Sequence, residues 1–344
     1  MVDLTIRGAG IIGLTIAWEA VNRGARVRVI DPGGPGAGAS GGLVGALQPH
    51  TPDVWNAKKQ FQLESLLRAR TLWPEVQAVS GLATGYAPAG RLQPLADERA
   101  VTLARARAAG ARDNWAGAAT WRVVDADAAG AWRPPSDSGL YIHDTLSALI
   151  HPRKAVQSLA QALTMKGTEI VTDGPDEGPV IWATGWTGLR DLGAALGRNI
   201  GGGVKGRAAL LKHDAAGAPQ IFAAGLHIVP HFDGTVAIGS TSEREFDQPD
   251  TTDHLLDDIV ARATELMPVL HGASVIDRWA GVRPRAMTRA PLMGAWPGRE
   301  GHFVANGGFK IGFGVAPRMA EVMADLVLDS RDAIPDDFRL SADA

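Results

Sequence analysis

Three glycines and one aspartate near the start of the chain have the spacing of a nucleotide-binding turn. The apolar stretch 4–7 leads directly into Gly8, Gly10 and Gly13, and Asp31 closes the next apolar stretch. In such a turn the first glycine lets the chain bend sharply, the second lets a diphosphate approach the backbone, and the third lets helix and strand pack closely. A carboxylate in the place of Asp31 accepts hydrogen bonds from both ribose hydroxyls and disfavours the 2′-phosphate of NADP. The pattern therefore predicts a dinucleotide site that is not built for NADP.

The residues around these glycines have the pattern of a strand, a helix and a second strand. A helical apolar pattern begins at Ile11 and Ile12 and ends at Gly24, which suits a C-terminal helix cap. The helix would present its unpaired N–H groups and the positive end of its dipole to the diphosphate. Ile11, Ile12 and Pro32 flank the turn and belong to the predicted site. The alternative is a glycine-rich turn of an α/β protein that binds no ligand.

The composition is that of a globular chain with a sizeable core. The chain has 344 residues, of which 45% are hydrophobic and 21% are charged, and its formal net charge is −3. This slight acidity disfavours a general nucleic-acid or membrane-surface protein. Because the chain has no cysteine, disulfides, thiolate metal sites, a cysteine nucleophile and a cofactor tethered through cysteine are excluded, and we predict no metal site. No basic and apolar leader opens the sequence and no apolar run has the length of a membrane span, so we expect a cytoplasmic protein.

Two styles of secondary structure alternate along the chain. Helices are predicted at 53–79, 97–109, 152–167, 253–270 and 317–328. Short buried strands are predicted at 168–171, 180–185 and 302–305. Residues 204–283 alternate with a period of two, and they predict strands at 220–232, 235–241 and 274–282. We therefore predict an α/β fold in which a Rossmann-like domain and an antiparallel β-rich domain are each discontinuous in sequence.

Several further motifs resemble those of one enzyme family, in the same order along the chain. They are Ser-Gly-Gly-Leu-Val-Gly-Ala at 40–46, Ile-His-Pro at 150–152, Ala-Thr-Gly-Trp at 183–186, Val-Lys-Gly at 204–206, His-Ile-Val-Pro at 227–230, Ala-Ile-Gly-Ser-Thr at 237–241, Asp-Arg-Trp-Ala-Gly-Val-Arg-Pro at 277–284 and Asn-Gly-Gly-Phe-Lys-Ile-Gly at 306–312. Over nearly its whole length the chain is similar to the D-amino-acid oxidase superfamily of FAD enzymes, above all to the glycine oxidases of bacterial thiamine synthesis.

The resemblance implies non-covalently bound FAD and a glutathione-reductase-like arrangement of the Rossmann-like domain. The FAD-binding domain is then expected at 1–83, 146–202 and 296–344. The substrate-binding domain is expected at 84–145 and 203–295.

The resemblance also assigns residues to the cofactor. Those expected beside the isoalloxazine ring are Ser40, Gly41, Gly42 and Leu43. Those expected at the diphosphate and ribose are Ala183, Thr184 and Gly185. A late glycine turn would bring backbone N–H groups to the end of the flavin where negative charge develops on reduction, and it comprises Gly307, Gly308, Phe309, Lys310, Ile311 and Gly312. The hairpin that follows Val171 is shorter than the family's usual one, so Val171 is expected to contact the adenine side.

Three residues are expected at the substrate. Arg283 lies in the stretch Gly-Val-Arg-Pro, and its planar guanidinium suits a carboxylate. The resemblance implies that Arg283 binds the substrate carboxylate. The alternative is a structural ion pair of Arg283 at a domain boundary. Lys310 stands where glycine oxidases carry an arginine, and His227 stands where they carry a tyrosine. Gly308 replaces a histidine of that family. For His227 a strand histidine that faces solvent or core is the alternative. Because these departures cluster at the expected pocket, the substrate need not be glycine.

The resemblance implies an FAD-dependent oxidoreductase that oxidises a small amine or amino acid, similar to glycine, sarcosine or a D-amino acid. Hydride would pass from the α-carbon to flavin N5, and water would hydrolyse the imine product. No catalytic side chain is required if the amine reacts in its neutral form. Oxygen or another acceptor would then take the electrons. We expect no membrane partner and no nucleic acid, and a homo-oligomer stays open.

Three other functions stay open at this point. Residues 41–49 resemble the corresponding loop of a branch that oxidises a modified tRNA base, although the net acidity and the lack of a basic run argue against it. A non-catalytic, flavin-binding electron-transfer protein would have the same glycine turns. A plain NAD dehydrogenase accounts for the first glycine turn but not for the late one.

Overall fold

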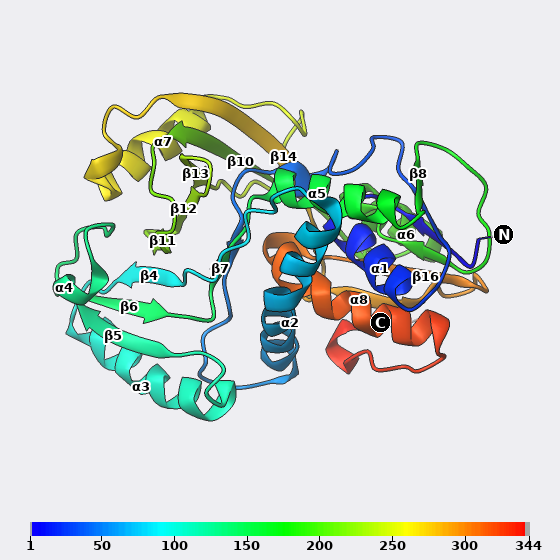
Figure 1. The fold of residues 1–344 in the computed structure, drawn as a ribbon, viewed down its shortest axis with the longest axis horizontal. Coiled ribbons are helices and arrows are strands. Elements are labelled where there is room, and N and C mark those ends of the chain that lie inside the picture. The colour runs from blue at the N-terminus through cyan, green and yellow to red at the C-terminus, as the bar shows by residue number, and fades with distance from the viewer. Residues whose placement is uncertain (1, 341–344) are drawn as a thin grey trace.

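The computed structural model describes residues 2–340, so the predicted domain limits at residues 1 and 341–344 lie outside the described residues. Two large sheets dominate the molecule, one in each lobe of Figure 1. One is largely parallel and carries helices, and the other is largely antiparallel. The predicted α/β fold with a Rossmann-like and a β-rich part is thereby confirmed.

The six-stranded sheet has the order β15-β16-β9-β1-β2-β8. Its strands are β1 (Leu4–Arg7), β2 (Val27–Ile30), β8 (Glu169–Val171), β9 (Val180–Trp182), β15 (Leu292–Ala295) and β16 (His302–Asn306). All neighbouring pairs are parallel except β15 and β16. The carboxyl ends of β1, β9 and β16 therefore meet at one edge of the sheet, which places the turns that follow them side by side.

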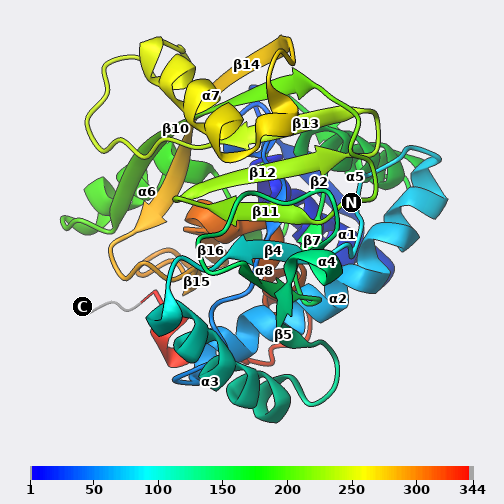
Figure 2. The same ribbon diagram turned by 90° about the vertical axis from the view of Figure 1, so that its left-hand side faces the viewer.

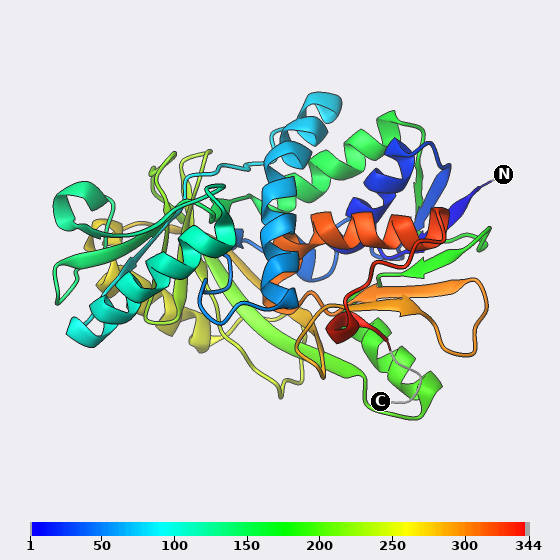
Figure 3. The same ribbon diagram turned by 90° about the horizontal axis from the view of Figure 1, so that it is seen from below.

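Four helices cover this sheet as one layer. They are α1 (Ile11–Asn22), α2 (Ala57–Ser80), α5 (Pro152–Met165) and α8 (Gly312–Leu328). Seen from below, α8 runs beside α1 and α2 crosses its start (Figure 3). Helix α6 (Gly185–Leu196) follows β9 and packs against the long strands of the second sheet. The predicted domain limits stay predictions. Strand β15 comes from the segment 203–295, which was predicted for the substrate-binding domain, and it pairs with β16 in the six-stranded sheet.

The eight-stranded sheet has the order β14-β10-β13-β12-β11-β4-β6-β5 (Figure 2). Its strands are β4 (Arg91–Pro94), β5 (Trp121–Asp125), β6 (Leu140–Asp144), β10 (Gly201–Lys212), β11 (Gln220–Ala223), β12 (Leu226–His231), β13 (Thr235–Gly239) and β14 (Val275–Ala286). Helix α7 (His254–Leu266) covers one face, and α3 (Glu98–Trp115) packs on β5. Short elements α4 (Ala126–Ala129) and the ribbon of β3 (Ala46–Leu47) with β7 (Ala148–Leu149) complete the fold.

Three predicted element limits differ from the structure. The segment 220–232 is two strands, because Ala224 and Gly225 form a tight turn with φ of 46° and 77°; both angles suit a hairpin turn, but the pair lacks the usual Asn-Gly signal. Helix α3 continues through Gly110 to Trp115. A Cβ added at Gly110 would lie 2.7 Å from the Pro52 carbonyl oxygen. Helix α8 begins at Gly312 and not at Pro317. Proline is typical of the first turn of a helix, but Pro317 lies inside α8.

A small apolar core joins the loop before β3 and the β3–β7 ribbon to the eight-stranded sheet. Leu43, Leu149, Ala208, Val229 and Ala237 are buried in it together. It packs the loop before β3 onto the face of the eight-stranded sheet opposite α7, which fixes that loop relative to both sheets. Among residues 2–340 no helix is long and apolar enough to cross a membrane. Over the same residues no group of His, Asp and Glu side chains could hold a metal ion.

Candidate active site

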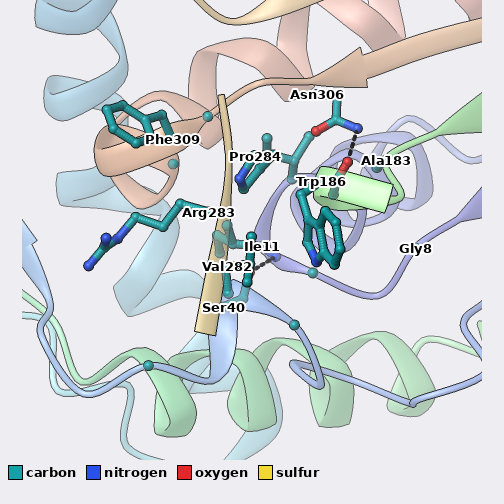
Figure 4. Close-up of a pocket in the computed structure, with 18 of the residues that line it drawn as sticks. Gly8, Ile11, Ser40, Ala183, Trp186, Val282, Arg283, Pro284, Asn306 and Phe309 are labelled. Carbon is teal, nitrogen blue, oxygen red and sulfur yellow. Dashed lines mark hydrogen bonds between the residues drawn. The ribbon is translucent and has the colours of Figure 1, made fainter. Parts of the chain in front are cut away.

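A cavity of about 630 Å³ lies between the two sheets (Figure 4). It is lined by the turn after β1, the loop 37–46, the start of α6, part of β14 and the turn 306–314. The volume lies in the range of sites for large organic ligands. The turns after β1, β9 and β16 open into it because they share one edge of the parallel sheet.

The glycine turn after β1 is shaped so that only hydrogen fits at two of its glycines. A Cβ at Gly8 would lie 2.4 Å from the Ala183 carbonyl oxygen, and one at Gly13 would lie 2.0 Å from the Gly8 carbonyl oxygen. Gly10 precedes α1 in extended conformation and lines the cavity. The N–H groups of the first turn of α1 have no acceptor inside the helix. This end of α1 therefore suits a diphosphate.

Asp31 closes β2 beside the cavity and is held by two backbone amides. Its Oδ2 accepts from Ala9 N at 2.7 Å, and its Oδ1 accepts from Gly33 N at 2.9 Å. Each carboxylate oxygen has a further lone pair. The side chain is thus oriented before any ligand arrives and keeps acceptor capacity for ribose hydroxyls.

Ser40 bridges the flavin-side loop and α1. Its Oγ accepts a hydrogen bond from Ile11 N at 2.9 Å (Figure 4), so its own proton is free to be donated to an anion in the cavity. The glycine cradle, the helix N-terminus, Asp31 and Ser40 together fit the ADP half of a dinucleotide cofactor such as FAD. In FAD, the diphosphate would lie at α1 and the ribose at Asp31.

Asn306, which the sequence analysis did not assign to the site, ties together two turns of the opposite wall. Its Nδ2 donates to the Gly185 carbonyl oxygen at 2.9 Å, and its Oδ1 accepts from Gly307 N at 2.8 Å (Figure 4). The start of α6 and the late glycine turn are therefore held at a fixed separation. The signal was its place at the head of the late motif, Asn-Gly-Gly-Phe-Lys-Ile-Gly.

The late glycine turn leads into α8 at the cavity wall. Gly308 precedes a short 3₁₀ turn, Phe309–Ile311, and α8 begins directly after it at Gly312. The first N–H groups of α8 thus lie beside the cavity, closer than the predicted start at Pro317 would bring them. These groups and the helix dipole favour negative charge at this position.

Arg283 projects from β14 on the side opposite Trp186 (Figure 4). Its Nη2 donates to Ser240 Oγ at 2.7 Å and its Nη1 to the Thr241 carbonyl oxygen at 3.2 Å. Within residues 2–340 no carboxylate lies within 4.0 Å of the guanidinium. Burial lowers the pKa of Arg283 to about 10, and the negative charge of Glu243 offsets only part of this effect. The guanidinium is therefore charged, desolvated and free to pair with an anion.

Gly206 on β10 makes the room for this guanidinium. A Cβ at Gly206 would lie 2.1 Å from both Nη1 and Nη2 of Arg283 and 2.3 Å from Cζ. The register explains the contact, because Arg283 pairs with Val204 and lies diagonally across from Gly206. The motif Val-Lys-Gly, which the sequence analysis gave only as part of the resemblance, thus includes the residue against which Arg283 lies.

A row of small residues lies on the sheet face next to Arg283. Across the sheet, Trp279 pairs with Ala208, Ala208 with Gly239, and Gly239 with His227. Directly paired residues share one face of a sheet, so Ala208 and Gly239 lie between the indole and the imidazole. Ala208 lines the cavity, whereas Val44 packs over Gly239, with Cγ2 3.0 Å from the place of a Gly239 Cβ. Phe222 continues the row beyond His227, and the two rings lie 4.8 Å apart.

The predicted cofactor residues fall into two groups in the structure. Those that line the cavity are Gly8, Gly10, Ile11, Ile12, Asp31, Pro32, Ser40, Gly42, Leu43, Ala183, Thr184, Gly185, Gly308, Phe309, Lys310, Ile311 and Gly312. Gly13, Gly41, Val171 and Gly307 do not line it. Gly13 packs under the turn and Gly41 against Gly36, while the Val171 carbonyl oxygen accepts from Asp31 N at 3.0 Å.

Of the three predicted substrate residues, Arg283 and Lys310 line the cavity and His227 lies behind its lining. Burial, together with the charges of Arg91, Lys310 and Arg283, lowers the pKa of His227 to about 4. His227 is therefore neutral at pH 7. Several tryptophans to which the sequence analysis gave no chemistry also line the cavity, among them Trp182, Trp186 and Trp296.

The sequence matches the DAO family, described as FAD dependent oxidoreductase, over residues 3–326. The chain belongs to this family of FAD-dependent oxidoreductases. It is 28% identical over 364 residues to the glycine oxidase of Geobacillus kaustophilus, a match that covers 94% of this chain and 92% of that protein. A match to the glycine oxidase of Pseudomonas putida, 35% identical, is limited to 159 residues, which are 45% of this chain and 42% of that protein.

The crystal structure of glycine oxidase from Geobacillus kaustophilus has the same fold. It superposes with a TM-score of 0.86 at 23% sequence identity, and the superposition covers 99% of this chain and 98% of that one. The family assignment confirms the predicted FAD cofactor and the predicted FAD-dependent oxidoreductase class. It also decides between FAD and the NAD dehydrogenase that the first glycine turn alone left open.

Proposed function

We propose that this protein oxidises a small amine or amino acid that carries a carboxylate. The observation that carries the proposal is Arg283, a desolvated guanidinium that faces the cavity with no carboxylate partner among the described residues. A buried charge without a partner is costly in a folded protein. A substrate carboxylate would remove that cost through two charge-assisted hydrogen bonds. The glycine oxidases among the relatives support an amino acid as the substrate.

FAD, when bound, supplies the two-electron oxidation by accepting a hydride. The residues of this chain supply position and charge. Arg283, fixed by Ser240 and Thr241, would hold the carboxylate and so orient the neighbouring α-carbon. Ala208, a small residue of the cavity lining, would leave room for the substrate on the sheet face. No side chain is required to remove a proton from an amine that binds in its neutral form.

The N-terminal dipoles of two helices would serve the cofactor. The first turn of α1 would hold the diphosphate, and the first turn of α8 would stabilise the negative charge that develops on the flavin when it is reduced. Loss of the hydride leaves a carbon–nitrogen double bond in the substrate, and water then releases a 2-oxo acid and the amine. Oxygen or another acceptor would take up the two electrons. A possible homo-oligomer and a cytoplasmic location remain predictions.

Anaerobic titration of the FAD-loaded protein tests this function. Glycine, sarcosine, proline and D-amino acids are added in turn while the visible absorbance of oxidised flavin is followed. We expect at least one carboxylated amine to bleach the flavin and to yield a 2-oxo acid. If no amine bleaches it, a non-catalytic flavin carrier replaces the proposal. Salt-sensitive binding of tRNA with no reduction by free amines would instead favour the tRNA-modifying branch.

A further inference from the structure

Two side-chain cations without a carboxylate partner among the described residues, Arg283 and Lys310, line the cavity, and a single substrate carboxylate requires only one of them. In the part of the chain that the structure describes, the ammonium group of Lys310 forms no ion pair, and its Nζ lies 5.8 Å from the centre of the Phe309 ring. Lys154, by contrast, pairs with Asp233 at 2.6 Å.

The two cations are electrostatic neighbours. Burial lowers the pKa of Lys310, and the charge of Arg283 lowers it further. Lys310 is exposed to solvent and Arg283 is partly buried, and the two positive charges repel each other unless anions lie against them. Arg283 and Lys310 together therefore favour a ligand that carries more than one negative charge.

Arg283 is sufficient for one carboxylate by itself. Each of its two Nη atoms donates one N–H to the protein, to Ser240 and Thr241, and keeps one N–H for a ligand. These two groups form the fork that a carboxylate accepts in bidentate fashion. Lys310 comes from a different wall, the 3₁₀ turn before α8, and is left to contact another group of the ligand.

His227, behind the cavity lining, has an unpaired polar atom. Its Nδ1 is buried and has no hydrogen-bond partner in the described residues. His227 shares the sheet face of Ala208 and Gly239, and the charges of Lys310 and Arg283 both reach it. A neutral imidazole can donate a hydrogen bond from one ring nitrogen. An unmade hydrogen bond at a buried atom points to a ligand or water that makes it.

We propose that the substrate carries two carboxylates, the first held by Arg283 and the second by Lys310, with the imidazole of His227 as a polar group behind the cavity wall. The inference rests on the proposed function and narrows its substrate class to dicarboxylic amino acids and secondary amines. In the reaction a hydride leaves the α-carbon for FAD, the amine nitrogen forms the double bond, and water releases a 2-oxo acid and the amine. The acceptor that reoxidises FAD takes the same two electrons.

Binding of unreactive acids tests the second carboxylate independently of turnover. Glutarate and butyrate differ by one carboxylate, and their dissociation constants for the FAD-loaded protein are measured by calorimetry. We expect glutarate to bind roughly 10- to 100-fold more tightly, the effect of one charge-assisted hydrogen bond. Lys310→Met should reduce this ratio to near 1, Lys310→Arg should keep most of it, and Lys212→Met, which alters an exposed lysine at the end of β10, should leave it unchanged.

Reactive pairs test the same point during reduction. Aspartate is compared with asparagine, and iminodiacetate with sarcosine, by the concentration that half-saturates anaerobic flavin bleaching. We expect the dicarboxylates to saturate at roughly 10-fold lower concentration or less, and Lys310→Met to abolish that preference. His227→Phe should weaken it without changing the affinity for butyrate.

Two results would overturn the inference. In one, Lys310→Met weakens glutarate and butyrate equally, so that both cations serve one carboxylate. In the other, Lys310→Met changes the reduction potential of bound FAD and leaves the binding ratio unchanged, so that Lys310 serves the cofactor. Failure of the proposed function is distinguishable, because no amine would then bleach the flavin whatever the binding ratio of the unreactive acids.

Discussion

Replacement of Gly206 by alanine should displace the Arg283 guanidinium and leave the fold and the cofactor in place. The added Cβ would lie 2.1 Å from Nη1 and Nη2 and 2.3 Å from Cζ, whereas ordinary contacts between such atoms need more than 3.4 Å. The atoms that must move are the far end of a flexible side chain. The guanidinium therefore shifts by more than 1 Å, the difference between these distances, at little cost to the backbone.

The magnitude follows from the hydrogen bonds that the shift breaks. A displaced fork loses at least one of two charge-assisted hydrogen bonds to the carboxylate, each worth about 1.5–3 kcal/mol. We therefore expect KM for a carboxylated amine to rise by roughly 10- to 150-fold, with the FAD content unchanged. Steady-state kinetics on the amine that bleaches the flavin, together with flavin absorbance per chain, measures both quantities.

Gly202 on the same strand supplies the matched control. A Cβ added at Gly202 meets no atom within 4 Å, so Gly202→Ala should change neither KM nor the melting temperature appreciably. A Gly206→Ala protein that keeps the wild-type KM would refute the placement of Arg283 at the substrate. A Gly206→Ala protein that loses FAD would show instead that the change disturbs the cavity as a whole.

Three further predictions concern the cofactor cradle and the buried histidines. Gly13→Ala would place a Cβ 2.0 Å from the backbone oxygen of Gly8, so we expect loss of FAD and a lower melting temperature, measured by flavin content and thermal unfolding; full FAD retention would contradict the cradle. Ser40→Ala removes the acceptor of Ile11 N and a donor to the diphosphate, and should weaken FAD by roughly 5- to 30-fold, measured by titration of the apoprotein, with kcat of the loaded protein unchanged. Burial lowers the pKa of both His151 and His227 to about 4 from an ordinary value of 6.5. Because the unfolded state binds more protons between these pH values, the free energy of unfolding should fall as pH drops from 6.5 toward 4, by up to about 1.4 kcal/mol per pH unit for each group. Urea unfolding across this range should show the slope and His227→Phe should reduce it, whereas a flat profile would contradict the prediction.

The sequence predicts the parts of the site that depend on local geometry. Gly8, Gly10, Gly13 and Asp31 could be placed from the sequence because a strand, a tight turn and a helix N-terminus constrain a short stretch of chain. The presence of most helical and strand segments was also predictable from periodicity, although limits such as the start of α8 were not. The turn at Ala224 was not, since its positive φ of 46° belongs to a residue that carries no turn signal.

Contacts between distant segments lie beyond such reasoning. The room for Arg283 at Gly206 depends on the register of β10 with β14, and the row from Trp279 through Ala208 to His227 depends on four strands in register. Nothing in the sequence fixes these pairings before the sheet is formed. The bridge that Asn306 makes to Gly185 joins residues 121 positions apart, and only the shared edge of the parallel sheet brings them together.

The most direct test of the whole account is the effect of Arg283→Met on a carboxylated amine and on an uncarboxylated one. Loss of both hydrogen bonds to the carboxylate should cost about 3–5 kcal/mol, or roughly 10²- to 10³-fold or more in kcat/KM. FAD should stay bound, and the slow bleaching by a simple amine without a carboxylate should keep its wild-type rate. An unchanged kcat/KM for the carboxylated amine would contradict the central claim that this guanidinium holds the substrate.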